Sequence, residues 1–232
     1  MTQAKTLLIV AHGQPSEPEP PEAHMEALAA RVAGHLPGWE VRSATIATPG
    51  KLAELGQSLP DDALIYPFFM ADGWFTQENL PRKLGPRRFR QLAPFGLDPA
   101  LPVLAAQWLV AEAAQRGWPP EDLSVMLAAH GSGRSHRPAE VALDFTDKLA
   151  AQLPATRFTV GFVEQDPRLV DAARGLGPQS LCLPFFALEG GHVLDDLPEA
   201  LGQVEYQGHR LPVLGDHPQV PALIAAAARM AA

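Results

Sequence analysis

The sequence contains the same succession of motifs twice. A chain with such an internal duplication is expected to fold into two similar halves. Three motifs recur in the same order: apolar runs ending in Ala-His-Gly at 7–13 and 125–131, Pro-Phe-Phe strings at 67–69 and 184–186, and Leu-Pro-Val-Leu strings at 101–104 and 211–214. With 232 residues, each copy has an ordinary domain size. We therefore expect two domains, residues 1–118 and 119–232.

The composition narrows the possible classes of protein. Apolar residues make up 47% of the chain, enough for two packed cores, yet no apolar run reaches the length of a membrane-spanning helix. The N-terminus lacks a secretory pattern, and the single cysteine, Cys182, excludes a disulfide framework or a cysteine-based metal site. A net charge of −8 argues against nucleic-acid partners. These features predict a cytoplasmic protein without membrane contact.

Short apolar runs alternate with helical patterns, which is typical of an α/β fold with parallel strands. Strands are predicted near 6–12, 40–46, 63–69, 102–107, 123–129, 157–163, 180–187 and 211–215. Helices are predicted near 21–36, 50–58, 76–84, 107–117, 138–152, 167–175, 193–202 and 218–231. We expect two tandem, similar domains, each with a four-stranded parallel sheet flanked by helices, joined through residues 116–120.

Polar side chains follow three strands of the predicted second domain. His130 follows the first strand, Glu164 the second, and His192 follows the third across a Gly-Gly pair. Ligands of open parallel sheets bind at the carboxyl ends of the strands, so these three groups are expected along one edge. Imidazole and carboxylate together suit divalent Fe, Co, Ni or Zn, and they also accept protons.

The first copy keeps only part of this set. His12 matches His130, but if Pro49 is matched to Pro167, Ile46 stands where Glu164 is found. Phe75 stands in the position of His192, next to Trp74. Groups needed only for packing would be needed equally in both copies. The second half is therefore predicted to be the reactive one, whereas Trp74 and Phe75 offer a flat apolar surface to a planar ligand.

Basic residues gather in two places in this acidic chain. Five of them lie between Arg82 and Arg90, including Arg87 and Arg88, and a second group contains Arg134 and Arg137. They serve either general solubility or the binding of a polyanionic ligand, because guanidinium pairs with carboxylate in a bidentate manner.

Taken together, the Ala-His-Gly-Ser-Gly string at 129–133, the Gly-Phe-Val-Glu string at 161–164 and the Gly-Gly-His-Val-Leu-Asp-Asp-Leu-Pro string at 190–198 resemble the sirohydrochlorin chelatases. These are the CbiX-type class II chelatases, and the likeness to their long, duplicated form covers nearly the whole chain. The resemblance implies insertion of Co²⁺ or Fe²⁺ into the carboxylate-rich tetrapyrrole sirohydrochlorin, in a cleft between the halves, for cobalamin or sirohaem synthesis.

The resemblance also implies roles for individual residues. His130 and His192 would be catalytic and contact the metal, with Glu164 as the acidic helper. The substrate-binding candidates are His12, Trp74, Phe75, Arg87, Arg88, Arg134 and Arg137. The metal, Co²⁺, Fe²⁺ or Ni²⁺, would be a substrate, no prosthetic group is expected, and a duplicated chain favours a monomer.

Other interpretations stay open at this point. The same residues would serve a non-catalytic carrier of a tetrapyrrole or a divalent metal, which only turnover distinguishes from an enzyme. Glu164 could cap the following helix, and Asp195 and Asp196 are expected to stabilise the helix after His192. A histidine phosphatase would need Arg before His-Gly, and a serine hydrolase a Gly-x-Ser-x-Gly turn; the sequence has neither.

Overall fold

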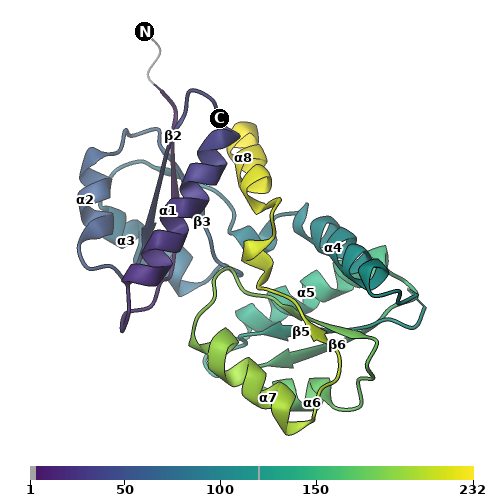
Figure 1. Cartoon of the computed structure of the whole chain (residues 1–232). Coiled ribbons are helices and arrows are strands. Elements are labelled where there is room, and N and C mark those ends of the chain that lie inside the picture. The colour runs from purple at the N-terminus through teal and green to yellow at the C-terminus, as the bar shows by residue number, and fades with distance from the viewer. Residues whose placement is uncertain (1–3, 120) are drawn as a thin grey trace. The chain divides into compact units, whose positions relative to one another are not determined.

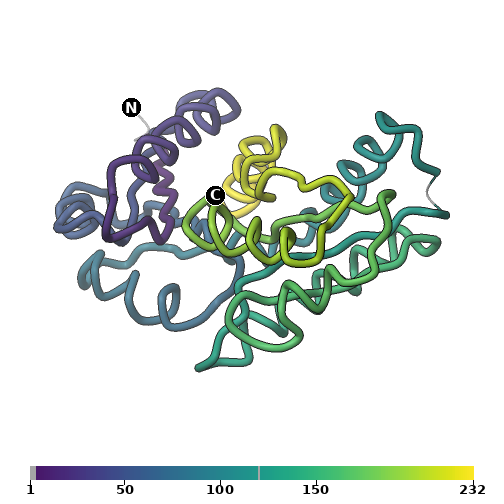
Figure 2. Tube along the Cα trace, turned by 60° about the horizontal axis from the view of Figure 1, so that its bottom comes forward, coloured from purple at the N-terminus to yellow at the C-terminus, as the bar shows by residue number. Residues whose placement is uncertain are grey.

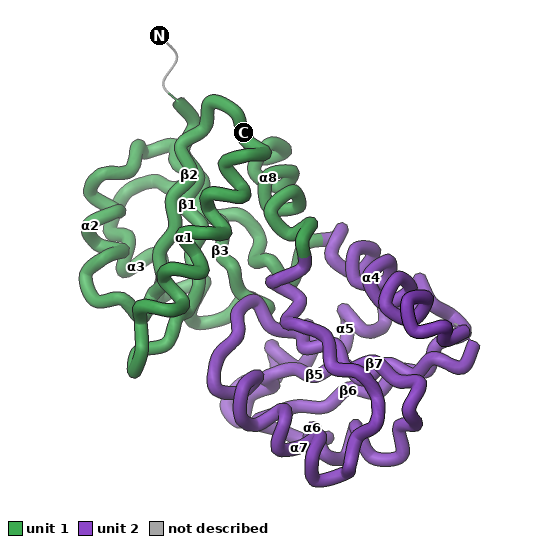
Figure 3. The backbone as a smooth tube through the Cα atoms, viewed as in Figure 1, with its two compact units in different colours: residues 1–98, 218–232 green, residues 99–217 purple. Residues whose placement is uncertain are grey.

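The computed structural model describes residues 4–119 and 121–232 and divides into two compact units (Figure 3). Unit 1 combines the chain up to Asp98 with Pro218–Ala232, and unit 2 is Pro99–His217. Each unit has one parallel sheet of four strands flanked by helices. The predicted α/β fold class is confirmed. Pro120, part of the predicted junction, lies outside the described residues.

Unit 1 has the strand order β2-β1-β3-β4. Its strands are β1 (Thr6–Ala11), β2 (Glu40–Thr45), β3 (Leu64–Pro67) and β4 (Arg90–Gln91). Its helical segments are α1 (Glu19–Gly34), α2 (Lys51–Ser58), the π-helical turn η1 (Phe75–Asn79), α3 (Leu80–Leu84), the 3₁₀ turn η2 (Phe95–Leu97) and α8 (Val220–Ala231).

Unit 2 repeats this arrangement in the order β6-β5-β7-β8. Its strands are β5 (Ser124–Ala129), β6 (Arg157–Phe162), β7 (Ser180–Pro184) and β8 (His209–Arg210). Its helical segments are α4 (Leu101–Gln115), α5 (Arg137–Gln152), α6 (Leu169–Ala173), the π-helical turn η3 (His192–Asp196), α7 (Leu197–Gln203) and the 3₁₀ turn η4 (Leu214–Asp216).

The central strands form the cores because helices cover both faces of a parallel sheet. Every residue of β1 is buried, as are Val125–Ala129 of β5. This double burial explains why both strands read as continuous apolar runs rather than as alternating patterns. Their carboxyl ends, where the Ala-His-Gly motifs lie, are thereby held on a rigid support.

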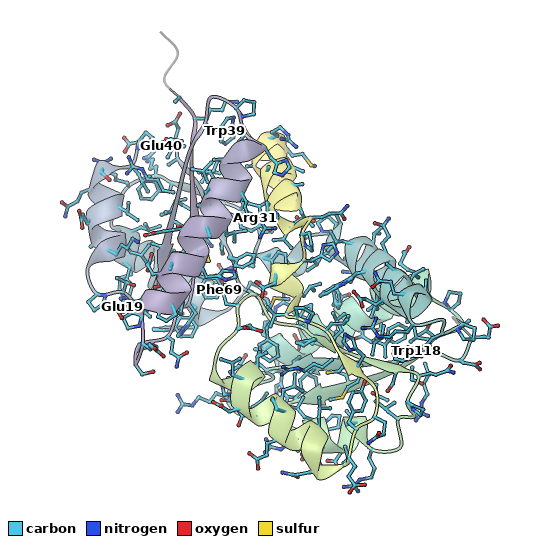
Figure 4. The ribbon with its side chains drawn as sticks, viewed as in Figure 1. Glu19, Arg31, Trp39, Glu40, Phe69 and Trp118 are labelled. Atoms are coloured by element: carbon cyan, nitrogen blue, oxygen red, sulfur yellow. The ribbon has the colours of Figure 1, made fainter. Side chains whose placement is uncertain are left out.

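The last helix of each sequence repeat belongs to the unit built mainly from the other repeat. Helix α4 packs on α5 in unit 2, and α8 packs on α1 and β3 in unit 1, where Figure 1 shows it beside α1. Arg31 of α1, labelled in Figure 4, donates from Nη2 to the carbonyl oxygen of Pro218 at 3.3 Å. The compact units therefore cross the repeat boundary expected at 118. Figure 2 traces the course of the whole chain, coloured from the N-terminus to the C-terminus.

The fourth strand of each unit was predicted in the wrong place. Residues 102–107 are helical, within α4, and the strand is Arg90–Gln91. Likewise, β8 is His209–Arg210, and 211–215 leads into η4. A strand of two polar residues carries no hydrophobic periodicity, so the sequence gives no sign of it.

The paired Leu-Pro-Val-Leu strings are also not structurally equivalent. Gly96 donates its N–H to Phe69 O at 2.9 Å, and Gly215 donates to Phe186 O at 3.0 Å. These matching bonds align η2 with η4 and hence the start of α4 with the start of α8. The string at 101–104 therefore opens a helix, whereas the string at 211–214 precedes one.

No helix in the described part of the chain combines the length and the apolar character needed to cross a membrane.

Candidate metal centre

Three side chains meet at the carboxyl edge of the sheet in unit 2. His130 directly follows β5, Glu164 lies just beyond β6, and His192 opens η3 after β7. One potential ligand atom from each residue lies within 4.8 Å of the others. The imidazole rings of the two histidines stand at 87° with their centroids 4.5 Å apart. The structure thus brings together the three residues that the sequence selects.

The backbone fixes the orientation of His130. Its Nδ1 lies 2.9 Å from the carbonyl oxygen of Gly131. A carbonyl oxygen only accepts, so Nδ1 carries the proton and Nε2 keeps its lone pair for a metal ion. Gly131 has a φ of +67°, and a Cβ there would meet the Gln165 side chain at 2.7 Å. The glycine of the Ala-His-Gly motif is therefore required by the turn that aims the imidazole.

A carboxylate orients the second imidazole. The Nδ1 of His192 donates to Asp196 Oδ2 at 2.6 Å, so its Nε2 is also left free. Partners of this kind fix the tautomer and the ring orientation of metal-binding histidines. Asp196 was expected from the sequence to stabilise the helix, and its contact with His192 was not predicted. The signal that would have revealed it is the spacing of four residues between an imidazole and a carboxylate on one helical turn.

All three side chains remain open to solvent. The exposed fractions are 44% for His130, 46% for Glu164 and 43% for His192. Glu164 Oε2 lies 4.0 Å from His130 Nδ1. A structural metal site is normally closed by four protein ligands, whereas a site with fewer ligands and open positions can exchange what it holds. This arrangement suits the transient binding of an ion together with proton transfer.

Unit 1 preserves the first imidazole and its support. His12 follows β1, and its Nδ1 lies 2.8 Å from Gly13 O. Its ring meets Phe75 edge-on with centroids 4.4 Å apart, just as His130 meets His192. Phe75 opens η1 as His192 opens η3. The position of His192 is therefore occupied in unit 1 by a ring that cannot bind a metal.

The counterpart of Glu164 is Ala47, not Ile46. Glu164 donates its N–H to His130 O at 3.0 Å, and Ala47 donates to His12 O at 2.9 Å. Ile46 bonds Ala11 O instead, as Val163 bonds Ala129 O. Matching Pro49 to Pro167 shifted the sequence alignment by one residue, whereas the backbone bonds set the true register. Unit 1 thus lacks the carboxylate as well as the second imidazole.

Two aromatic side chains are exposed beside His12. Trp74 is 51% exposed and Phe75 is 38% exposed, and their ring centroids are 5.1 Å apart. The guanidinium carbon of Arg82, from α3, lies 5.8 Å from the centre of the Trp74 ring. Arg82 belongs to the basic group between residues 82 and 90, and it is the member that the structure brings to these rings.

Arg87 and Arg88 are not brought to this edge. Arg87 donates to the carbonyl oxygen of Leu59 and lies 3.7 Å from Asp61, just before β3. Both arginines also precede β4, and the strands are parallel, so they lie at the amino edge of the sheet, opposite His12. The structure therefore does not bring these two candidates to the carboxyl edge of the unit 1 sheet, and their role in substrate binding stays a prediction.

Arg134 and Arg137 lie where the sequence places them, in the exposed segment that follows His130 and opens α5. Arg137 also lies 3.7 Å from Glu140 across one turn of that helix. Two guanidinium groups are therefore carried by the same loop that carries the first imidazole.

A half-buried carboxylate, that of Glu22, supports the edge of unit 1. Burial by itself would raise the pKa of Glu22, but bonds from Lys51, Thr48 and Thr45 outweigh it and hold the pKa below its usual value. The two bonds to Lys51 Nζ and Thr48 Oγ1 measure 2.5 and 2.6 Å. Thr45 packs under Gly13, where an added Cβ would meet it at 2.6 Å. The network thus joins α1, the end of β2 and α2 beneath the Ala-His-Gly turn.

Comparison with known proteins identifies relatives of this chain. The family model CbiX matches residues 124–231. The structure of CbiX, described as the terminal enzyme for biosynthesis of siroheme in denitrifying bacteria, is 47% identical, with a TM-score of 0.90 over 98% of this chain and 100% of that chain. A search among curated proteins found no match.

Two more distant structures share the fold. SirB from Bacillus subtilis with Fe³⁺ is 15% identical, with a TM-score of 0.74 over 98% of this chain and 95% of that chain. A multi-domain protein of Deinococcus radiodurans with structural similarity to chelatases is 23% identical, with a TM-score of 0.72 over 97% of this chain and 55% of that chain.

Proposed function

The chain belongs to the CbiX family of sirohydrochlorin chelatases, and from this premise we propose that it inserts a divalent metal ion into sirohydrochlorin. The observation that carries the proposal is the cluster of His130, Glu164 and His192, whose ligand atoms lie within 4.8 Å of one another. It combines borderline metal ligands with a proton acceptor on one accessible edge. Insertion requires both.

The two histidines are assigned to the metal and Glu164 to the protons. The free Nε2 atoms of His130 and His192 replace water molecules around the incoming ion. When the ion enters the macrocycle, two pyrrole nitrogens lose their protons, so the charge of the ion is balanced by two protons released. Glu164 accepts the two protons one after the other and passes each to solvent, to which its side chain is open. An incomplete ligand set keeps the ion from being retained by the protein.

The substrate is bound by the remaining candidates. Arg134 and Arg137 are proposed to pair with carboxylates of the tetrapyrrole, because guanidinium matches carboxylate geometry. The exposed rings of Trp74 and Phe75 are proposed to contact the flat macrocycle. His12, which is bonded to Gly13 O and meets the Phe75 ring edge-on, is proposed to contact it as well. Arg82 joins this group through its position over the Trp74 ring.

The proposed metal is Fe²⁺ or Co²⁺, taken as a substrate. Iron is favoured because the relative with 47% identity is described as an enzyme of siroheme biosynthesis. One SirB structure is described with Fe³⁺, and a second is described in complex with cobalt. His and Glu ligands select weakly among these ions, so Ni²⁺ belongs in the same test.

Anaerobic incubation of the protein with sirohydrochlorin and each metal in turn tests the proposal. The visible spectrum of the macrocycle reports insertion, and His192→Ala is expected to abolish turnover. His35→Ala, at the end of α1, serves as the matched histidine control and is expected to keep it. Binding of sirohydrochlorin without turnover for any metal would overturn the chelatase assignment and favour a carrier.

Cytoplasmic location and a monomeric state complete the proposal. Cys182 is buried and free, as is usual in a reducing compartment. Two repeats in one chain supply what a single-copy relative would need a second subunit to provide. Sedimentation equilibrium at micromolar concentration is expected to give the mass of one chain, 24.9 kDa, and twice that mass would refute the monomer.

A further inference from the structure

A backbone carbonyl beside His192 has no helical donor. In η3 the N–H of Leu197 bonds the carbonyl oxygen of His192, five residues back. The next residue is Pro198, which has no N–H to give to the carbonyl of Val193. The π-helical turn that presents the imidazole therefore leaves the carbonyl of the following residue without its backbone partner.

A side chain from the neighbouring strand takes the place of the missing donor. Arg210, the last residue of β8, donates from Nη1 to Val193 O at 2.9 Å. Strand β8 pairs with β7, which leads into the Gly-Gly-His segment. Arg210 thus links the sheet directly to the residue next to His192.

The same device occurs in unit 1 with a different side chain. In η1 the N–H of Leu80 bonds Phe75 O. The next residue, Pro81, has no N–H that could donate to Thr76 O. Gln91, the last residue of β4, donates from Nε2 to Thr76 O at 3.0 Å. Different side chains thus donate to the equivalent carbonyl in the two copies. The requirement for a donor therefore comes from the π-helical turn and the proline that follows it.

We propose that Arg210 is a positioning residue for the metal centre, which holds η3 so that His192 faces His130 and Glu164. It acts through the carbonyl of Val193 and does not touch the metal. The inference rests on the proposed function for its meaning in catalysis. Gln91 makes the equivalent bond in unit 1, where the turn presents Phe75 and not a metal ligand. Comparing variants at the two positions therefore distinguishes a role in holding the fold from a role at the metal centre.

The primary test measures Co²⁺ affinity by titration, which requires no turnover. Arg210→Met removes the bond while keeping an apolar chain of similar reach, and it is expected to weaken Co²⁺ binding by roughly threefold to tenfold, somewhat below the effect of losing a direct partner of a ligand. Arg210→Gln, which copies unit 1, is expected to recover most of the affinity. Gln91→Met is the matched control and should leave Co²⁺ affinity unchanged while lowering the melting temperature by as much as Arg210→Met.

Restoring the missing donor gives a second, independent test. Pro198→Ala supplies an N–H in the position of the absent one, so Arg210→Met is expected to cost little Co²⁺ affinity in the Pro198→Ala background. Near-UV circular dichroism confirms that each variant is folded. If Arg210→Met alone unfolds the protein, the Arg210→Gln variant and the double variant still decide the matter.

Two results would overturn the inference: wild-type Co²⁺ affinity in Arg210→Met, or an equal loss of affinity in Gln91→Met. Failure of the proposed function gives a different pattern. If the wild-type protein binds Co²⁺ at the histidine site, weakens in Arg210→Met and never metallates sirohydrochlorin, the chelatase assignment fails and the positioning role stands. If turnover is present, Arg210→Met should lower kcat with little change in KM for sirohydrochlorin.

Discussion

At the residue scale, the two copies show how few side chains separate a metal site from its scaffold. His12 and His130 make the same bond to the following glycine carbonyl. The difference lies in what surrounds them: Glu164, His192 and Asp196 in unit 2 are replaced by Ala47, Phe75 and Asn79 in unit 1. Asn79 is buried, with its Oδ1 unpaired. The loss of the imidazole thus coincides with the loss of the carboxylate that would orient it.

Because Asp196 orients His192, we expect Asp196→Asn to weaken metal binding. The amide keeps the size of the side chain but accepts the Nδ1–H of His192 more weakly, so metal affinity should fall by roughly tenfold or more. Stability should change little, because Asp196 is half-exposed. Isothermal titration with Co²⁺ measures the effect, and Asp195→Asn, which removes the same charge one residue away, is the control. Equal losses in both variants would show that only the local charge matters.

Cys182 gives a prediction about reactivity. Complete burial raises the pKa of its thiol to about 12. Because the thiolate is the reactive form, the folded protein should not react with a disulfide reagent at pH 8. One thiol per chain should appear when the protein is unfolded in guanidinium. Rapid reaction of the native protein would mean that β7 opens far more readily than its full burial implies.

At the element scale, the elements with a clear hydrophobic periodicity were predicted from the sequence, and the elements without one were missed. The six longer strands and the helices over 19–34 and 137–152 follow from apolar runs and helical spacing. The short strands β4 and β8 do not, because two polar residues carry no pattern. The trio at the metal centre was predictable since parallel strand ends share an edge. Asp196 was predictable from its spacing of four residues from His192, but Arg210 was not, because its bond to Val193 O depends on the π-helical form of η3.

The Glu22 network predicts how the joined elements respond to pH. The pKa of Glu22 is lowered by folding, so its contribution to stability is fully present above the unfolded value near 4.5 and is lost as the pH falls through the lower folded value. Glu22→Gln should therefore cost about 1–3 kcal/mol at pH 7, and less at pH 3.

Chemical denaturation at both pH values measures this difference. Glu26→Gln is the matched control, because Glu26 also pairs with Lys51, at 3.4 Å, but is 65% exposed. An unchanged free energy of unfolding at pH 7 in Glu22→Gln would refute a stabilising network. So would a loss that is as large at pH 3 as at pH 7.

At the scale of the whole molecule, the duplication was readable from the sequence, but the exchange of the last helices was not. Helix α4 is apolar on most of its surface, with Leu101, Leu104 and Leu109 buried. Such a pattern predicts that the helix is buried, but it does not predict which unit the helix packs against. Only the structure assigns α4 to unit 2 and α8 to unit 1.

Because the scaffold is kept in both copies, we expect that a second metal site can be built in unit 1. The triple variant Ala47→Glu, Phe75→His and Asn79→Asp copies the missing groups onto positions whose backbone bonds match those of unit 2. His12 already has the orientation of His130, held by its 2.8 Å contact with Gly13 O. The variant should bind two Co²⁺ ions per chain, compared with one for the wild-type protein, by equilibrium dialysis.

Each part of the graft has its own control. Phe75→His alone restores only the second imidazole, without Asp to orient it or Glu to complete the set, and should bind the second ion weakly. Adding His12→Ala to the triple variant should abolish the second site and leave the first intact. If the folded triple variant still bound a single ion, matching backbone bonds would not be enough to make the two edges equivalent. Something beyond these four positions would then have separated the reactive copy from the degenerate one.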